Sequence, residues 1–245
     1  MSGHAVPELP EPPAAPHAVG DAQAAAGYAA PLLDAVARAL AVQVAGSDAG
    51  AALVRELEQI QQALQALDPQ RIRRDSGVLG RLFGRDLERQ AEAETLHAQL
   101  GVVLLRADQH ATRLQLAIDA HAAMADLAEA GMAALERWIG AAAAPASAAA
   151  AAGAAALGEA WSRRLDHLRR VVATWQLEAA QWRLLEQQGR ELSQRYRHIR
   201  DVLLPAWRQA ASAVQAAHGA QHATRAGQAQ QHILAEVQAM RARLR

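Results

Sequence analysis

The chain has no cysteine and no lysine, and only 3% of its 245 residues are aromatic. The lack of cysteine excludes disulfides, thiol nucleophiles and cysteine-ligated metals. Large core residues are scarce, because much of the 51% hydrophobic fraction is alanine. We therefore do not expect an ordinary globule built around a core of large side chains.

Acidic and basic residues are balanced, with 25 of each and a formal net charge of +0. Nucleic-acid binding needs a net basic surface, so we expect no nucleic-acid partner. The N-terminus carries no basic, leucine-rich signal sequence, which argues against secretion. The uncharged stretch Ala141–Leu157 is mostly alanine and contains Pro145 and Gly153, whereas a membrane span needs about 20 strongly apolar residues. We expect a cytoplasmic protein, with a peripheral contact to the inner membrane left open.

Alanine, leucine, glutamine, glutamate and arginine dominate the chain, and all five are strong helix formers. No run of β-branched and aromatic residues between turn signals indicates a strand. Apolar residues recur at alternating steps of three and four, which is typical of a coiled-coil seam. Trp161, Trp175 and Trp182 are spaced by multiples of seven and could fill the space left by alanines on a facing helix. The pattern predicts an all-α fold, an elongated antiparallel helical bundle or coiled-coil hairpin.

Proline, glycine and alanine divide the chain into segments. The proline-rich N-terminus cannot bury enough apolar surface to offset its ordering entropy, so we expect it to be disordered. The predicted segments are a disordered Pro/Ala-rich tail (1–29), short N-terminal helices (30–69), a basic glycine-containing connector (70–85), a long helix (86–140), an alanine-rich hinge (141–157) and a long return helix (158–245) broken at Pro205.

Pro205 and Trp207 lie inside this return helix. Proline removes one backbone donor, and its ring clashes with the carbonyl four residues earlier, here that of Asp201. The helix must kink at Leu204 or restart with Pro205 in a first turn, where proline is tolerated. Trp207 is then either a buried anchor of the bundle or an exposed contact for a partner.

Three short elements carry a family resemblance. Gly77–Gly84 (GVLGRLFG) is similar to a loop of the type G-x-L-x-x-L-F-G, and Arg164–Leu168 (RLDHL) to an R-L-x-x-L element. Leu204–Gln209 (LPAWRQ) is similar to an isoleucine–proline–x-tryptophan–basic–glutamine element. In this order they resemble the TelA (KlaA-like) family of bacterial toxic-anion-resistance proteins, associated with tellurite resistance. The matching positions are Gly77, Leu79, Leu82, Phe83, Arg164, Leu165, Pro205, Trp207, Arg208 and Gln209.

Few residues suggest chemistry. His218 and His222 are spaced to share a metal, but no third ligand has a recognisable spacing, so a solvated glutamine-rich face is favoured. His121 lies within a seam, where pairing with an acid across the bundle is favoured over catalysis. No nucleophile–base pair, phosphate loop or HExxH motif is found. We expect no enzyme activity, no metal, no cofactor and no small-molecule substrate.

The connector interleaves arginines with apolar residues, including Leu82 and Phe83. The favoured interpretation is a linker whose Leu82 and Phe83 dock onto the bundle while the arginines stay solvated. With the resemblance, the leading hypothesis is a non-enzymatic helical scaffold in tolerance of tellurite or similar stress, which binds protein partners or itself as a homodimer. The alternative is a membrane-surface coiled coil that binds anionic lipid or an acidic partner through its Arg-rich connector, which contains Arg71, Arg73, Arg74, Arg81 and Arg85.

Overall fold

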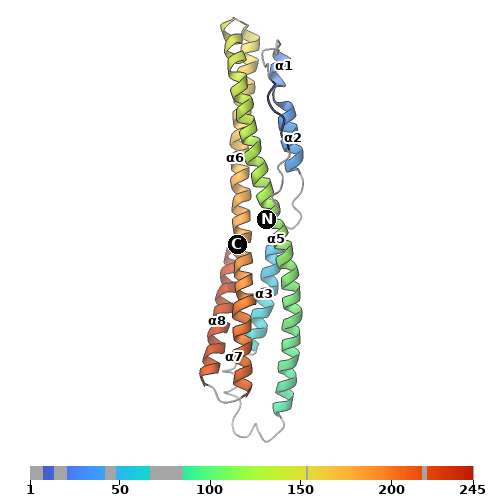
Figure 1. Cartoon of the computed structure of the whole chain (residues 1–245), viewed down its shortest axis with the longest axis vertical. Coiled ribbons are helices and arrows are strands. Elements are labelled where there is room, and N and C mark those ends of the chain that lie inside the picture. The colour runs from blue at the N-terminus through green and yellow to red at the C-terminus, as the bar shows by residue number, and fades with distance from the viewer. Residues whose placement is uncertain are drawn as a thin grey trace. The chain divides into compact units, whose positions relative to one another are not determined.

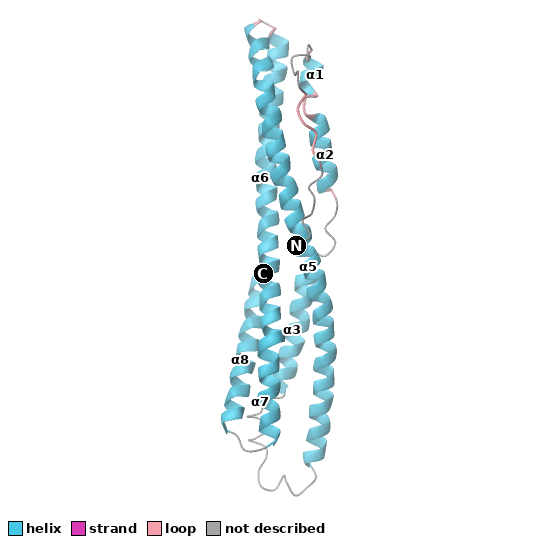
Figure 2. Ribbon diagram, viewed as in Figure 1, coloured by secondary structure: helices cyan, strands magenta, loops and turns pink. Residues whose placement is uncertain are grey.

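The described part of the chain is entirely helical apart from its turns and short connections (Figure 2). The prediction of an all-α helical bundle is confirmed. None of the helices described combines the length and the apolar character that crossing a membrane requires. The structure, a computed structural model, describes residues 8–13, 21–41, 48–66, 85–152, 154–216 and 220–244.

Two long helices, α5 and α6, each contribute to two compact units (Figure 1). Unit 1 comprises Met1–Ala45 and Asp119–Glu186, and unit 2 comprises Gly46–Ile118 and Gln187–Arg245. In chain order the elements are α1 (Ala22–Ala26), α2 (Ala30–Leu40), α3 (Ala49–Ala66), α5 (Arg85–Ala151), α6 (Ala155–His198), the π-helix η3 (Ile199–Leu203), α7 (Leu204–Ala216) and α8 (Ala220–Arg243).

In unit 1, α1 and α2 pack on the α5–α6 hairpin. Trp161 and Trp175 of α6 are buried. A Cβ on Gly131 would lie 3.2 Å from Cζ3 of Trp175, so glycine makes room for the indole. Trp175 therefore fills space beside a small residue of α5, which here is a glycine, whereas Trp161 packs against Tyr28. The core also contains Leu32, Val36, Leu135, Trp138 and Leu168.

In unit 2, α3, α7 and α8 complete a bundle with the remaining parts of α5 and α6. The chain reverses between α7 and α8, and α8 packs against both α7 and α3 (Figure 1). A Cβ on Gly189 of α6 would lie only 2.6 Å from Cγ1 of Ile118 on α5, so these two helices approach closely there. The core is built largely from Leu53, Leu57, Ile60, Leu64, Tyr196, Ile199, Trp207, Ile233, Val237 and Met240.

The prediction of a disordered tail over 1–29 is wrong for the part that the structure describes. Tyr28 is buried, and its ring meets Trp138 and Trp161 edge-on at centroid distances of 5.0 and 5.1 Å. The Trp138 indole Nε1 donates a hydrogen bond to the Pro10 carbonyl at 2.9 Å. A few aromatic contacts thus order a segment whose overall composition is that of a disordered chain.

The alanine-rich hinge predicted over 141–157 does contain the end of α5 and the start of α6, but most of this range is helical. Helix α5 continues through Pro145 to Ala151, and α6 begins at Ala155. Alanine has the highest helix propensity of all residues, which helps to offset the cost of about 3 kcal/mol for an interior proline. Ala142 and Ala149 are buried, so packing adds to this preference.

The return helix over 158–245 has a second interruption that the sequence analysis missed. Helix α8 starts anew at Ala220 and buries Ile233, Val237 and Met240 in unit 2, which a continuous helix could not do. The short helices over 30–69 are also divided, since α2 belongs to unit 1 and α3 to unit 2. The long helix predicted over 86–140 is α5, and all of the connector 70–85 except Arg85 lies outside the described residues.

Candidate functional site

The Pro205 break is a single π turn in a continuous helix. The Leu204 amide donates to the Ile199 carbonyl, five residues earlier. Helices α6, η3 and α7 follow one another without a non-helical residue, so the helix does not stop and restart as one of the two predicted outcomes required. The wider π turn directly before Pro205 accommodates the proline ring. Single π turns inside helices are frequent at functional sites.

Trp207 is a buried anchor of unit 2. Its side chain is 1% exposed and packs in the same core as Ile199 and Leu203. Pro205, Arg208 and Gln209 are exposed. This element therefore presents two different surfaces, an indole that holds the core and a proline, an arginine and a glutamine that face solvent.

Arg164 and Leu165 anchor the turn between α1 and α2 in unit 1. Leu165 is buried, and the Arg164 Nε donates to the Tyr28 carbonyl at 2.7 Å. The backbone is left-handed at Ala29, with φ 63°, so the guanidinium satisfies a carbonyl beside a strained residue. Burial lowers the pKa of Arg164.

The predicted family positions are divided between the two units and the undescribed connector. Arg164 and Leu165 belong to unit 1, and the element from Pro205 to Gln209 belongs to unit 2. The remaining positions, Gly77, Leu79, Leu82 and Phe83, lie outside the described residues.

The most elaborate polar cluster of unit 1 surrounds Arg183, which the sequence analysis did not single out. Its guanidinium donates to Glu129 at 3.0 Å, to Asp126 at 2.6 Å and to Glu186 at 3.2 Å. These carboxylates, with Glu129 first, raise the pKa of Arg183 above its ordinary value. Glu186 is only 4% exposed, and its carboxylate lies against the Arg183 guanidinium. Asp126 and Glu129 come from α5 and Arg183 from α6, so the cluster fixes how the two helices are aligned.

His121 lies beside this cluster and stacks on Trp182, with centroids 5.5 Å apart and planes inclined by 27°. Its Nδ1 is buried and has no hydrogen-bond partner among the described residues. Burial lowers the pKa of His121, and the charge of Glu186 partly opposes this. The predicted acid across the bundle is thus present as a nearby charge, while the ring's main contact is aromatic.

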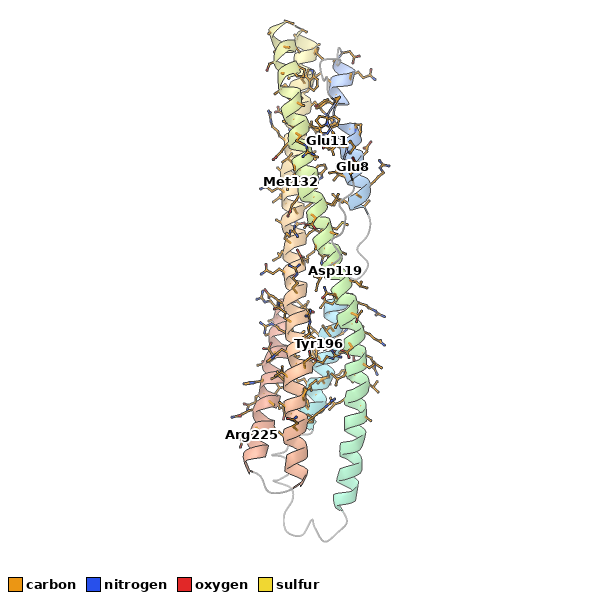
Figure 3. All side chains as sticks on the ribbon, in the orientation of Figure 1. Glu8, Glu11, Asp119, Met132, Tyr196 and Arg225 are labelled. Atoms are coloured by element: carbon orange, nitrogen blue, oxygen red, sulfur yellow. The ribbon has the colours of Figure 1, made fainter. Side chains whose placement is uncertain are left out.

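Polar contacts also link the helices of unit 2. Tyr196 is one of the residues labelled in Figure 3. Its hydroxyl donates to Asp108 at 2.6 Å, and the Arg200 Nε lies 3.0 Å from the same carboxylate. Burial and the Asp108 hydrogen bond raise the pKa of Tyr196. Gln230 of α8 donates to the Leu64 carbonyl at 3.1 Å and so satisfies one of the last carbonyls of α3.

The described surface offers little enclosed space. A hollow of ≈ 260 Å³ in unit 1 is lined by Glu136, Ile139, Arg169 and Val172. Ligand pockets usually enclose about 300–1,000 Å³. No group of three or more potential metal ligands comes together within the described ranges. His218 and the side chain of His222 lie outside them.

Comparison of the chain with family models, with curated proteins and with solved structures gives no match. Membership of the TelA family stays a prediction that rests on the short motifs.

Large apolar side chains are exposed on the outer faces of both long helices. On α6 these are Leu177, Leu184 and Leu185, and on α5 they include Leu105 and Leu116. The sequence analysis did not single out any of these leucines. Exposed apolar residues that gather on one face are typical of a contact surface for another protein.

Replacing Trp207 by alanine should lower the free energy of unfolding by about 3–5 kcal/mol, because a fully buried indole is lost. Arg208→Ala, one residue further along the same helix and exposed, should change it by about 0.5 kcal/mol or less. Chemical denaturation of both variants measures the difference. Equal, small effects would contradict the assignment of Trp207 to the core.

His121 should make the protein less stable in acid. Its pKa in the folded state lies below the unfolded value of about 6.5. Protonation therefore favours the unfolded chain, and stability falls as the pH drops from that value through the folded pKa. His121→Phe keeps a ring against Trp182 but cannot titrate, so it should lose less stability than wild type between pH 8 and pH 5.

The matched control for this measurement is His167→Phe, at an exposed position of α6 in the same unit. It should retain the acid sensitivity of the wild type in denaturation curves recorded at both pH values. If the wild type and His121→Phe lost the same amount of stability between pH 8 and pH 5, His121 would not contribute to the acid sensitivity.

Proposed function

We propose that this protein is a non-enzymatic helical scaffold of the toxic-anion-resistance type, which contributes to tellurite tolerance by holding protein partners. The observation that carries the proposal is that the polar side chains between the helices bind one another. Arg183 is shared by carboxylates on both long helices of unit 1, and Asp108 is shared by Tyr196 and Arg200 in unit 2.

These contacts have a structural role, because they hold neighbouring helices together. A general base or nucleophile needs a lone pair directed at a substrate. The carboxylates of Asp126, Glu129 and Glu186 are instead directed at the Arg183 guanidinium. Such networks fix the alignment of helices, since an offset along the axis would leave a charge unpaired. Helices with a fixed alignment inside a unit are what a scaffold needs in order to present a surface to a partner.

The exposed leucines supply the surface itself. Leu177 and Leu184 are 67% and 55% exposed, and they are seven residues apart on one face of α6. Burying such side chains against a partner yields about 1.5–3 kcal/mol each. The alternative of anionic-lipid binding through Arg71, Arg73 and Arg74 concerns residues outside those described, and no described feature favours it.

Complementation of a deletion strain tests the proposal. Deleting the gene should raise sensitivity to tellurite, and the wild-type gene should restore tolerance. The variant Leu177→Glu/Leu184→Glu changes only exposed positions, so it should fold but restore little tolerance. The variant Asp126→Asn/Glu129→Gln changes cluster carboxylates to amides of the same shape, and it should restore tolerance in proportion to the amount of folded protein.

Two outcomes would contradict the scaffold. One is unchanged tellurite sensitivity after deletion. The other is a folded Asp126→Asn/Glu129→Gln protein that restores nothing while the leucine variant restores fully, as expected if the carboxylates carried out chemistry. Circular dichroism and immunoblotting of each variant provide the measure of folded protein.

A further inference from the structure

Helix α6 carries a second apolar seam on its outer face. Ala173, Leu177, Ala180 and Leu184 follow one another at steps of four, three and four, the spacing of a coiled-coil seam. All of them are exposed in the structure. The bundle core of unit 1 uses a different face, since Trp175 and Ala179 are buried. Leu177 follows Trp175 by two residues, about 200° around the helix.

The order of residues along this seam is self-complementary. Small and large side chains alternate, so a copy that runs in the opposite direction can place a leucine over each alanine. A two-fold axis midway between Leu177 and Ala180 sets Leu177 against Ala180 of the other copy, and Ala173 against Leu184. Every layer then pairs one alanine with one leucine, which lets the helices approach closely without voids.

The flanks of the seam also favour a second copy. Thr174, Gln176 and Gln181 border it, are exposed and carry no charge. Glutamine amides both donate and accept hydrogen bonds, so they are compatible with their own copies. The nearest guanidinium on this stretch, that of Arg183, is already bound to carboxylates of its own unit. Arg170, one turn before Ala173, is exposed on the same side of the helix, and the two-fold axis sets it against the uncharged Gln187 of the other copy. A second copy therefore meets no repulsion.

We propose that the face from Ala173 to Leu184 is a homodimerisation surface on which a second copy of this chain packs antiparallel. This goes beyond the scaffold proposal by naming the partner of the exposed leucines. The seam is short, so it buries less than the roughly 1,600 Å² of a standard interface. The dimer is therefore weak and its population depends on protein concentration.

Cysteine cross-linking tests the geometry, because the chain has no cysteine of its own. In the antiparallel pair the two copies of residue 180 are offset by three residues, about 4.5 Å along the axis, and the two copies of residue 173 by eleven, about 16 Å. A disulfide needs Cα atoms about 4.4–6.8 Å apart. Ala180→Cys should form a disulfide-linked dimer on mild oxidation, and Ala173→Cys should not.

A mixture of Ala173→Cys and Leu184→Cys should give the mixed dimer, because these positions face each other. Cross-linking of Ala173→Cys as fast as Ala180→Cys would indicate parallel or random contact and would overturn the proposal. Failure of Ala180→Cys to cross-link at high protein concentration would overturn it as well.

Sedimentation equilibrium tests the same surface without cross-links. The wild type should shift from 26.1 kDa toward twice that mass as its concentration rises, and Leu177→Glu/Leu184→Glu should remain at 26.1 kDa. Leu116→Glu is the matched control, since Leu116 is 65% exposed on α5 in unit 2 and should leave dimerisation unchanged.

A wild type that is monomeric at all concentrations would overturn the homodimer. The proposed surface would also be wrong if Leu116→Glu abolished dimerisation as fully as Leu177→Glu/Leu184→Glu. A monomeric wild type whose Leu177 and Leu184 are still needed for tellurite tolerance would leave the scaffold standing, with a different protein on this face. Failure of the two proposals is thereby distinguishable.

Discussion

The close approach of α5 and α6 is the constraint on which the rest of the structure depends. In unit 1 Gly131 stands against Trp175, and in unit 2 Gly189 stands against Ile118 with room for no additional methyl group. A chain with so few aromatic residues can build a core only by matching each large side chain with a small one. The alanine-rich composition is therefore part of the packing scheme, because tryptophan and isoleucine occupy the space that small residues leave.

This packing explains where the polar groups lie. Where two helices are held close together, a charged side chain at the edge of the contact can reach a partner on the other helix. Arg183 supplies one for Asp126 and Glu129, and Asp108 receives both Tyr196 and Arg200. The side chains of Arg183, Asp126 and Glu129 stay 40%, 44% and 47% exposed there. The resulting bundle is fixed internally and carries its unused apolar residues on the outside. That combination supports the proposal of a scaffold.

The sequence predicted what depends on local preference and periodicity. The all-α class, the seams on the long helices and the interruption of regular α-helix near Pro205 all follow from spacing and from proline's missing donor. The predictions were wrong where contacts between residues far apart in the sequence determine the structure. Trp138 orders the segment around Pro10, 128 residues away, and the packing of α8 on α3 turns the chain back after α7. Alanine's helix propensity also outweighed Pro145.

The polar cluster around Arg183 could not be predicted from the sequence for a similar reason. Asp126, Glu129 and Arg183 look like ordinary surface charges in the sequence, and only the alignment of α5 with α6 brings them together. The only sign of this region in the sequence was that His121 and Trp182 lie on the seams of the long helices. The second seam on α6 was present in the spacing, but periodicity alone does not tell which of two seams is buried.

A double-mutant cycle at Gly189 and Ile118 tests the central claim most directly. Alanine at Gly189 gains about 1 kcal/mol of helix propensity, but its methyl group meets Ile118, so Gly189→Ala should destabilise wild type by about 1–3 kcal/mol. In an Ile118→Ala background the same change should become neutral or stabilising. Gly101→Ala, where nothing lies within 4 Å of the added Cβ, should stabilise the wild type. If Gly189→Ala stabilised the wild type as much as Gly101→Ala, the close packing of α5 against α6 would be contradicted.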